Sequence, residues 1–148
     1  MTHLQDFYID GAWVPASDGC ARMAVVNPSS EKTLGQLALG RAEDADRAIR
    51  AARTAFDRGT PPLADRIALL EAIIAEYDRR SDDIAAAISA EMGAPETFSR
   101  EAQTWAGKIH LESTLTAAKS FAWEERHGSS LWIREGIGVC ALITPWNW

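Results

Sequence analysis

The sequence predicts an α/β fold in which a β hairpin and a layer of helices lead to the first strand of a parallel sheet. Turn-punctuated β-prone runs occupy residues 1–40, helical periodicity occupies residues 42–122, and a continuous apolar run lies at Val139–Ile143. Glycines before that run and a proline after it are typical of a strand buried on both faces. Ligands of open α/β sheets bind at the carboxyl ends of strands, so the residues that follow this run are the first candidates for a binding site.

Short strands are predicted at the start of the chain. Two β-prone runs flank Asp10-Gly11 within residues 7–15, and this dipeptide is the strongest short-range hairpin signal. The runs Ala24–Pro28 and Thr33–Ala38 read as two further strands. Together these segments predict an N-terminal β patch.

Four helices are predicted next. The first begins at Ala42 with an acidic first turn, the second ends near Tyr77, and the third is capped by Ser81 and stops before Gly93. The fourth runs from about Glu96 to Ala122. The apolar stripes of the first and fourth helices are Ala45, Ala48, Ile49, Ala52 and Phe56, and Phe98, Ala102, Trp105 and Ile109. The fourth helix carries a second stripe next to the first, Leu111, Leu115 and Ala118, and two adjacent stripes imply its burial against more than one neighbour.

A further strand is predicted at Ser129–Arg134, which contains Leu131-Trp132-Ile133. It has no hairpin partner nearby in the sequence. Because an apolar strand with free edges is a template for pairing with another chain, the segment predicts an oligomer contact.

The composition favours small molecules or other proteins as binding partners. The chain of 148 residues is 47% hydrophobic and 24% charged, and its net charge of -6 argues against nucleic acid and anionic membranes as partners. The N-terminus lacks a signal-peptide pattern, and no apolar run approaches the ~20 residues of a membrane span. The two cysteines, Cys20 and Cys140, match no metal spacing; a reduced, cytoplasmic protein is the simpler interpretation, and one disulfide between them is the alternative.

Chemistry is expected around Asn147, the polar residue among Pro145, Trp146 and Trp148. A fixed amide N–H there can donate to a developing oxyanion, although a turn held by aromatic anchors explains the same residues. Cys140 lies within the apolar run, where a thiol is normally inert packing, and a nucleophilic role is the alternative. The three histidines show no metal or triad spacing, and no metal site is predicted from spacing.

Several motifs in order resemble the aldehyde dehydrogenase superfamily. They are Tyr8-Ile9-Asp10-Gly11-Ala12-Trp13-Val14, Val26-Asn27-Pro28, Glu43-Asp44-Ala45-Asp46-Arg47-Ala48, Asp65-Arg66, Glu91-Met92-Gly93-Ala94-Pro95, and Arg134-Glu135-Gly136-Ile137-Gly138-Val139 running into Leu142-Ile143-Thr144-Pro145-Trp146-Asn147-Trp148. The resemblance covers the whole chain and implies the N-terminal portion of an NAD(P)+-dependent enzyme that oxidises an aldehyde to a carboxylic acid.

The resemblance also implies roles for individual residues. Asn147 is implied to hold the oxyanion of a cysteine thiohemiacetal, and Ile143, Thr144, Pro145, Trp146 and Asn147 to line the crevice for NAD or NADP, which the sequence does not distinguish. Some family members bind a cation near the positions of Val25, Val26 and Glu91. In the family, the strand matching Ser129–Glu135 belongs to the oligomerisation element, which implies a homo-oligomer, a dimer or tetramer.

These matches predict a division of the chain. Residues 1–128 are assigned to the cofactor-binding domain, 129–135 to the oligomerisation strand, and 136–148 to the first cofactor-sheet strand and the start of the active-site loop. Glu135-Gly136 replaces the usual Glu-Pro of the family, and neither the family nucleophile nor the base glutamate is matched in the chain. The chain alone is therefore expected to be inactive. The alternative is a non-catalytic interaction module that keeps the oligomerisation strand.

Overall fold

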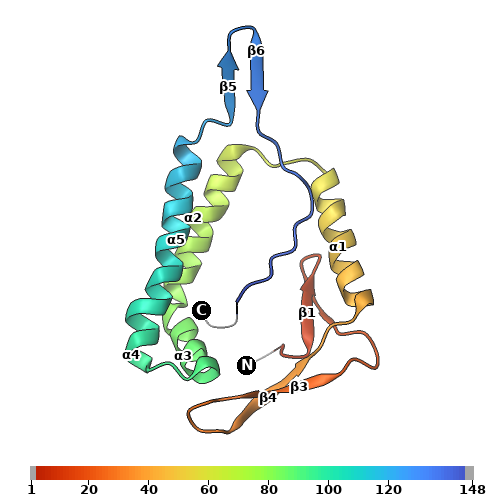
Figure 1. Ribbon diagram of the computed structural model, residues 1–148, viewed down its shortest axis with the longest axis vertical. Helices are drawn as coiled ribbons and strands as arrows, with labels where there is room; N and C mark the ends of the chain where they lie inside the picture. Colours follow the sequence, from red (N-terminus) through yellow and green to blue (C-terminus); the bar gives the residue numbers. More distant parts are fainter. Residues whose placement is uncertain (1–2, 146–148) are drawn as a thin grey trace. The chain divides into compact units, whose positions relative to one another are not determined.

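The computed structural model describes residues 3–145 and divides the chain into two compact units. The first unit comprises Met1–Gly59, Ala87–Ala94 and Gly138–Trp148, and the second comprises Thr60–Ala86 and Pro95–Ile137. Hairpins and helices follow one another along the chain, as the colours of Figure 1 show. This mixture of strands and helices confirms the predicted α/β class.

The predicted N-terminal hairpin is confirmed. Strand β1 (Asp6–Ile9) pairs antiparallel with β2 (Ala12–Pro15). The loop residues Asp10 and Gly11 have φ values of 52° and 78°. A type I′ turn requires positive φ at both positions, which is why Asp-Gly joins these strands.

The next two predicted strands are also confirmed. Strand β3 (Arg22–Val26) pairs antiparallel with β4 (Thr33–Ala38), with a bulge between Val25 and Val26. In the connecting turn the side-chain oxygen of Asn27 accepts hydrogen bonds from the N–H groups of Ser29 and Ser30, at 2.9 and 3.1 Å. This local bonding of an asparagine to the backbone just after it fixes the turn.

Helix α1 (Ala42–Asp57) begins where the acidic first turn predicts. Arg41 precedes it and donates its backbone N–H to the Asp44 carboxylate at 2.9 Å. On this helix the apolar Ile49 is 53% exposed, whereas the charged Asp44 is 4% exposed. Ile49 and Ala52 on the apolar side of α1 are exposed, whereas Ala45 and Ala48 line a cavity that they share with Phe7, Tyr8 and Ile9.

Helices α2 (Leu63–Arg79) and α5 (Thr104–Ser120) lie side by side in the second unit (Figure 1). The hydroxyl of Tyr77 donates to the Thr104 carbonyl at 2.9 Å, and Lys108 forms an ion pair with Asp78 at 2.8 Å. Gly107 makes this packing possible, because a Cβ there would overlap the Tyr77 hydroxyl. The close approach of Tyr77 to Gly107, the Tyr77–Thr104 hydrogen bond and the Lys108–Asp78 ion pair therefore hold the two helices together.

Helix α3 (Ser81–Met92) follows α2 after Arg80. The expectation that Ser81 caps it is wrong, since Ser81 is the first helical residue. The Arg80 carbonyl accepts the N–H of Ile84 at 3.0 Å, so Arg80 occupies the position before the helix.

The fourth predicted helix is interrupted. It consists of α4 (Glu96–Phe98), a π-helical turn η1 (Ser99–Gln103) and then α5. The hydroxyl of Thr104 donates to the Ser99 carbonyl at 2.8 Å inside this wider turn. The π turn changes the phase of the helix, so Ser99 and Thr104 are buried while Phe98 and Trp105 are 52% and 57% exposed. The predicted burial of those two aromatic side chains is wrong.

A third hairpin corrects another expectation. Strand β6 (Ser130–Ile133) does have an intrachain partner, the antiparallel strand β5 (Glu124–His127). Of the two loop residues, Gly128 has a φ of 62° and Ser129 has no positive φ, the pattern of a type II′ turn. The sequence pattern did not predict β5, because this strand consists of charged and polar residues without apolar alternation.

The predicted strand Val139–Ile143 is not formed in the described structure, where residues 134–145 have no regular secondary structure. A strand needs neighbours that accept and donate its backbone hydrogen bonds, and residues 3–145 supply none to this segment. The buried hydrophobic residues in the described part are Ala38 and Ala85, which are 4% and 3% exposed. No helix within residues 3–145 is long and apolar enough to cross a membrane.

Candidate functional site

The predicted cofactor residues lie at the end of the segment after β6. Ile143 is 96% exposed, and Thr144 and Pro145 are exposed beside it. Trp146 and Asn147 fall outside the described residues. The structure therefore places three of the five predicted crevice residues on one exposed segment of the first unit that has no regular secondary structure. Their apolar surface is free to form one wall of a binding site.

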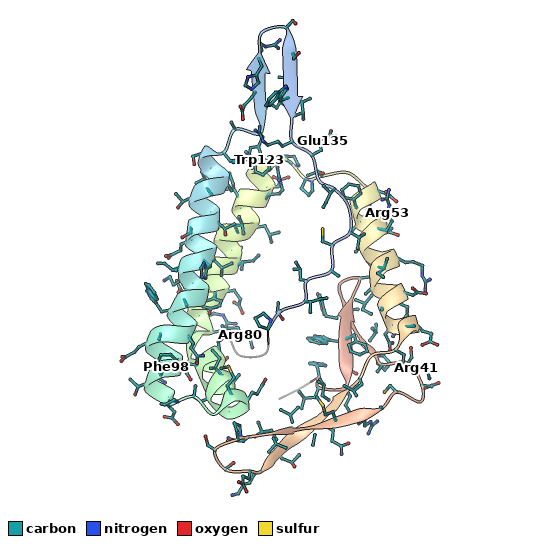
Figure 2. The ribbon with its side chains drawn as sticks, in the orientation of Figure 1. Arg41, Arg53, Arg80, Phe98, Trp123 and Glu135 are labelled. Atoms are coloured by element: carbon teal, nitrogen blue, oxygen red, sulfur yellow. The ribbon has the colours of Figure 1, made fainter. Side chains whose placement is uncertain are left out.

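The start of this segment passes helix α1. Gly138 has a φ of 115°, and a Cβ there would lie 3.9 Å from a guanidinium nitrogen of Arg53. That guanidinium is paired with Asp57 at 2.7 Å and lies 5.4 Å from the Phe56 ring centroid. Arg53 is labelled on α1 in Figure 2, beside the segment. The backbone conformation of Gly138 is one that other residues rarely adopt.

Cys140 is exposed, so the expectation that it packs inside a strand is wrong for this chain. Its recorded polar contact within the described residues is a distant one of 3.9 Å to the Gly138 carbonyl. Activation of a thiol requires a nearby base or cation, and no such group contacts Cys140 in residues 3–145. The structure gives no support to a nucleophilic role.

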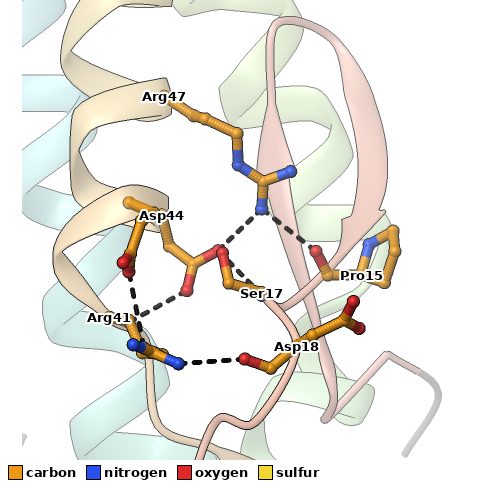
Figure 3. Close-up of polar contacts among 7 residues, drawn as sticks. Pro15, Ser17, Asp18, Arg41, Asp44 and Arg47 are labelled. Atoms are coloured by element: carbon orange, nitrogen blue, oxygen red, sulfur yellow. Dashed lines mark hydrogen bonds and ion pairs between the residues drawn. The ribbon is translucent and has the colours of Figure 1, made fainter.

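Asp44, in the first turn of α1, is the centre of a polar cluster in the first unit (Figure 3). Its carboxylate accepts hydrogen bonds from the N–H of Arg41, from the N–H and hydroxyl of Ser17 at 3.0 and 2.8 Å, and from Arg47 at 2.7 Å. Arg47 also donates to the Pro15 carbonyl at 3.1 Å, and Arg41 donates to the Asp18 carbonyl at 3.0 Å. The cluster therefore ties the end of the first hairpin to the start of α1.

These contacts decide the chemistry of Asp44. The N–H of Arg41, followed by the donors of Ser17 and Arg47, holds the pKa of this carboxyl far below its ordinary range, although burial acts in the opposite direction. A carboxylate that already accepts four hydrogen bonds and has so low a pKa cannot serve as a base near neutral pH. Asp44 is a structural brace, and sequence reasoning missed it. The available signal was an aspartate in the first helical turn three residues ahead of an arginine.

The region of the possible cation site is brought together in the first unit. Gly93, after the end of α3, lies against the turn that follows β3, and the Ser29 hydroxyl donates to its carbonyl at 3.5 Å. Glu91 is exposed on α3, and Val26 is 44% exposed. No group of three or more His, Cys, Asp or Glu side chains suited to a metal occurs in the described part of the chain. A cation near Val25, Val26 and Glu91 stays a prediction.

The β5–β6 hairpin presents an exposed apolar strand. Leu131, Trp132 and Ile133 are 45%, 57% and 56% exposed. Arg134 holds the base of the hairpin by pairing with Glu125 at 2.7 Å and by donating to the Ala122 carbonyl at 2.8 Å. This arrangement suits an interface, and the predicted oligomer contact stays a prediction.

Comparison with known proteins assigns the chain to a family. The sequence model of the aldehyde dehydrogenase family matches residues 13–148. A 3-succinoylsemialdehyde-pyridine dehydrogenase from a Pseudomonas species is 41% identical over all of this chain and 31% of its own length. A putative aldehyde dehydrogenase of Staphylococcus haemolyticus is 38% identical over 99% of this chain and 31% of its own length.

Solved structures agree with these relatives. An aldehyde dehydrogenase C variant of Pseudomonas syringae, in complex with NAD+ and octanal, has a TM-score of 0.93 and 38% identity, over 99% of this chain and 30% of that one. The aldehyde dehydrogenase of Bartonella henselae has a TM-score of 0.79 and 37% identity, over 82% of this chain and 25% of that one.

The chain belongs to the aldehyde dehydrogenase family, and it corresponds to the N-terminal portion of these oxidoreductases. It spans about 31% of the length of the curated relatives that it matches.

Proposed function

We propose that the chain supplies the oxyanion donor and one wall of the cofactor crevice to an enzyme that oxidises aldehydes to carboxylic acids. The observation that carries this proposal is the TM-score of 0.93 with the structure of an aldehyde dehydrogenase C in complex with NAD+ and octanal. Residues 1–128 then belong to the cofactor-binding domain, 129–135 to the oligomer contact of a homo-oligomer, and 136–148 to the active-site approach.

The apolar character of the exposed stretch before Trp146 fits the lining of a nicotinamide cofactor site. Ile143, Thr144 and Pro145 form an exposed, mostly apolar stretch, and cofactor sites are lined mainly by apolar surface with a few polar groups. Trp146 and Asn147 extend the stretch in sequence. When bound, NAD or NADP supplies the hydride acceptor.

Asn147 contributes by donating its amide N–H to the carbonyl oxygen of the aldehyde as a cysteine from another part of the enzyme attacks the carbonyl carbon. Negative charge develops on that oxygen in the transition state and in the thiohemiacetal that follows. A neutral donor already held in place stabilises this charge, and such donors contribute about 2.7–4 kcal/mol in measured cases. The adjacent apolar residues exclude water, which strengthens the interaction.

A chimeric enzyme tests this function. The chain replaces the matching segment of Pseudomonas syringae aldehyde dehydrogenase C, and octanal-dependent reduction of NAD+ and of NADP+ is followed by absorbance. We expect an active chimera whose kcat falls about 10²–10³-fold in Asn147→Ala. The loss should appear in kcat more than in KM, because the oxyanion exists only after attack.

Gln36→Ala is the matched control, because Gln36 is an exposed side-chain amide on β4. Its kcat should equal that of the parent chimera. An inactive chimera, or an Asn147→Ala variant with the parental kcat, would refute the proposed role.

A further inference from the structure

The β5–β6 hairpin extends beyond the ends of helices α2 and α5 in the second unit, and residues 121–123 connect it to α5 (Figure 1). Within the described residues, no extensive contact joins either of its strands to a helix. The direction in which the hairpin points is therefore decided by the side chains at its base.

Four side chains lie in a row at this base, with two aromatic rings between two guanidinium groups; Trp123 is labelled there in Figure 2. The Arg134 guanidinium lies 5.3 Å from the Phe121 ring centroid. The Phe121 and Trp123 rings meet edge to face, with their centroids 4.8 Å apart. The Arg66 guanidinium lies 4.8 Å from the Trp123 ring centroid. These geometries are favourable for ring pairs and for a cation over a ring, and we call the four residues the cation–aromatic ladder.

The two ends of the ladder belong to the two parts that it joins. Arg66 lies in the first turns of α2, whereas Arg134 directly follows β6. Arg134 is fixed to the hairpin by its ion pair with Glu125 at 2.7 Å, and its backbone N–H donates to the Trp123 carbonyl at 3.0 Å. A rotation of the hairpin about its base would separate the rings from the guanidinium groups.

Hydrogen bonds do not explain why the far end of the ladder is arranged in this way. The N–H groups at Arg66 Nε and Trp123 Nε1 are buried, and neither has an acceptor among the described residues. A buried donor without an acceptor destabilises a fold, so the contacts of the ring faces must outweigh this cost.

We propose that the cation–aromatic ladder fixes the direction of the β5–β6 hairpin on the helices and thereby positions strand β6 to pair with a second copy of the enzyme. The exposed side chains Leu131, Trp132 and Ile133 supply the apolar contact, and the ladder supplies its orientation. Strands pair only when their backbone groups face each other in register, so a hairpin that turns freely loses this contact although β6 is unchanged. The pairing of two copies rests on the homo-oligomer proposed above, whereas the direction of the hairpin does not.

Distances within one copy of the chimera test the direction of the hairpin. Spin labels are attached through non-natural keto amino acids at Ser113, on α5, and at Ser129, in the hairpin turn. Labelled protein is diluted with unlabelled protein, and the label-to-label distance is measured by pulsed electron resonance. We expect one narrow distance distribution in the parent and a clearly broader one in Phe121→Leu, which breaks two contacts of the ladder but keeps an apolar side chain. Arg66→Gln should broaden the distribution too, because it removes the contact with Trp123.

Light scattering during dilution of the unlabelled chimera measures the consequence for assembly. Phe121→Leu should raise the Kd between copies about tenfold, which corresponds to about 1.4 kcal/mol and is on the scale of one aromatic pair with one cation–π contact. Its far-ultraviolet circular dichroism spectrum should equal that of the parent, because the helices and strands themselves are unchanged.

Phe98→Leu is the matched control, because Phe98 is 52% exposed, Phe121 is 48% exposed, and only Phe121 belongs to the ladder. The control should keep the narrow distribution and the parental Kd. A parental distribution in Phe121→Leu would overturn the inference, and so would an equal broadening in Phe98→Leu. A broader distribution with a parental Kd would support the role of the ladder in hairpin direction and count against β6 as the contact between copies. The distance measurement needs no turnover, so an inactive chimera would refute the role of Asn147 without affecting this test.

Discussion

Replacing Gly93 by alanine should destabilise the first unit for two separable reasons. Gly93 has a φ of 74°, and a Cβ there would lie 2.7 Å from the Pro28 ring and 3.0 Å from the Ser29 hydroxyl. The left-handed backbone costs a residue with a side chain about 1–2 kcal/mol. Overpacking against the rigid proline ring adds about 1–3 kcal/mol. The expected total is about 2–5 kcal/mol.

Gly19→Ala separates the two contributions. Gly19 has nearly the same φ, 72°, but a Cβ there would meet only an Arg41 guanidinium nitrogen at an ordinary 3.5 Å. This control should therefore lose only the backbone part, about 1–2 kcal/mol. Both variants are made in the chimera, and urea unfolding is followed by far-ultraviolet circular dichroism. Equal losses of unfolding free energy would show that the contact between Gly93 and the Asn27-Pro28 turn does not constrain the fold.

Three further outcomes are expected. Asp44→Asn should lower the urea midpoint of the chimera by a constant amount between pH 5 and 8. The pKa of Asp44 is depressed in the folded state, so its carboxylate stabilises the fold above the ordinary pKa of about 3.9, and this stabilisation is lost only as the pH falls through the folded-state pKa. Asp46→Asn, at an exposed side chain, should leave the midpoint unchanged, and equal midpoints for the two variants would contradict the structural role of Asp44. Trp132→Asp should shift the chimera toward smaller oligomers in light scattering, unlike Lys32→Asp on the exposed β3–β4 turn; an unchanged mass would remove β6 from the interface. The chain alone should self-associate and oxidise no octanal, so a monomer with cooperative melting, or any turnover, would contradict the reasoning.

Local signals predicted much of the fold. Asp10-Gly11 identified the first hairpin because a type I′ turn depends on two adjacent residues. The acidic first turn identified the start of α1 for a similar reason, since the helix dipole acts over one turn. The π turn at Ser99–Gln103 could not be predicted, because it depends on how the Thr104 hydroxyl meets the Ser99 carbonyl and on packing around both residues. Strand β5 was missed because its residues Glu124–His127 carry no apolar alternation.

The candidate site was predictable to a smaller extent. The run Val139–Ile143 was correctly recognised as apolar, but its strand requires neighbours outside the described chain, so periodicity alone could not give its burial. The Asp44 brace went unnoticed because Ser17 lies 27 residues before Asp44 in the sequence. Only folding brings the donors of Ser17 next to those of Arg41 and Arg47. The role of Asn147 came from family resemblance and stays a prediction.

The π turn also affects how homologous sequences should be aligned. One residue of an α-helix corresponds to a rotation of about 100°. A relative with an uninterrupted helix in place of Ser99–Gln103 would reach the same orientation of α5 with one residue fewer. An alignment without a gap there would pair Thr104 with a position on a different side of the helix. Substitution patterns along α5 should therefore be compared only after a one-residue gap is allowed at this turn.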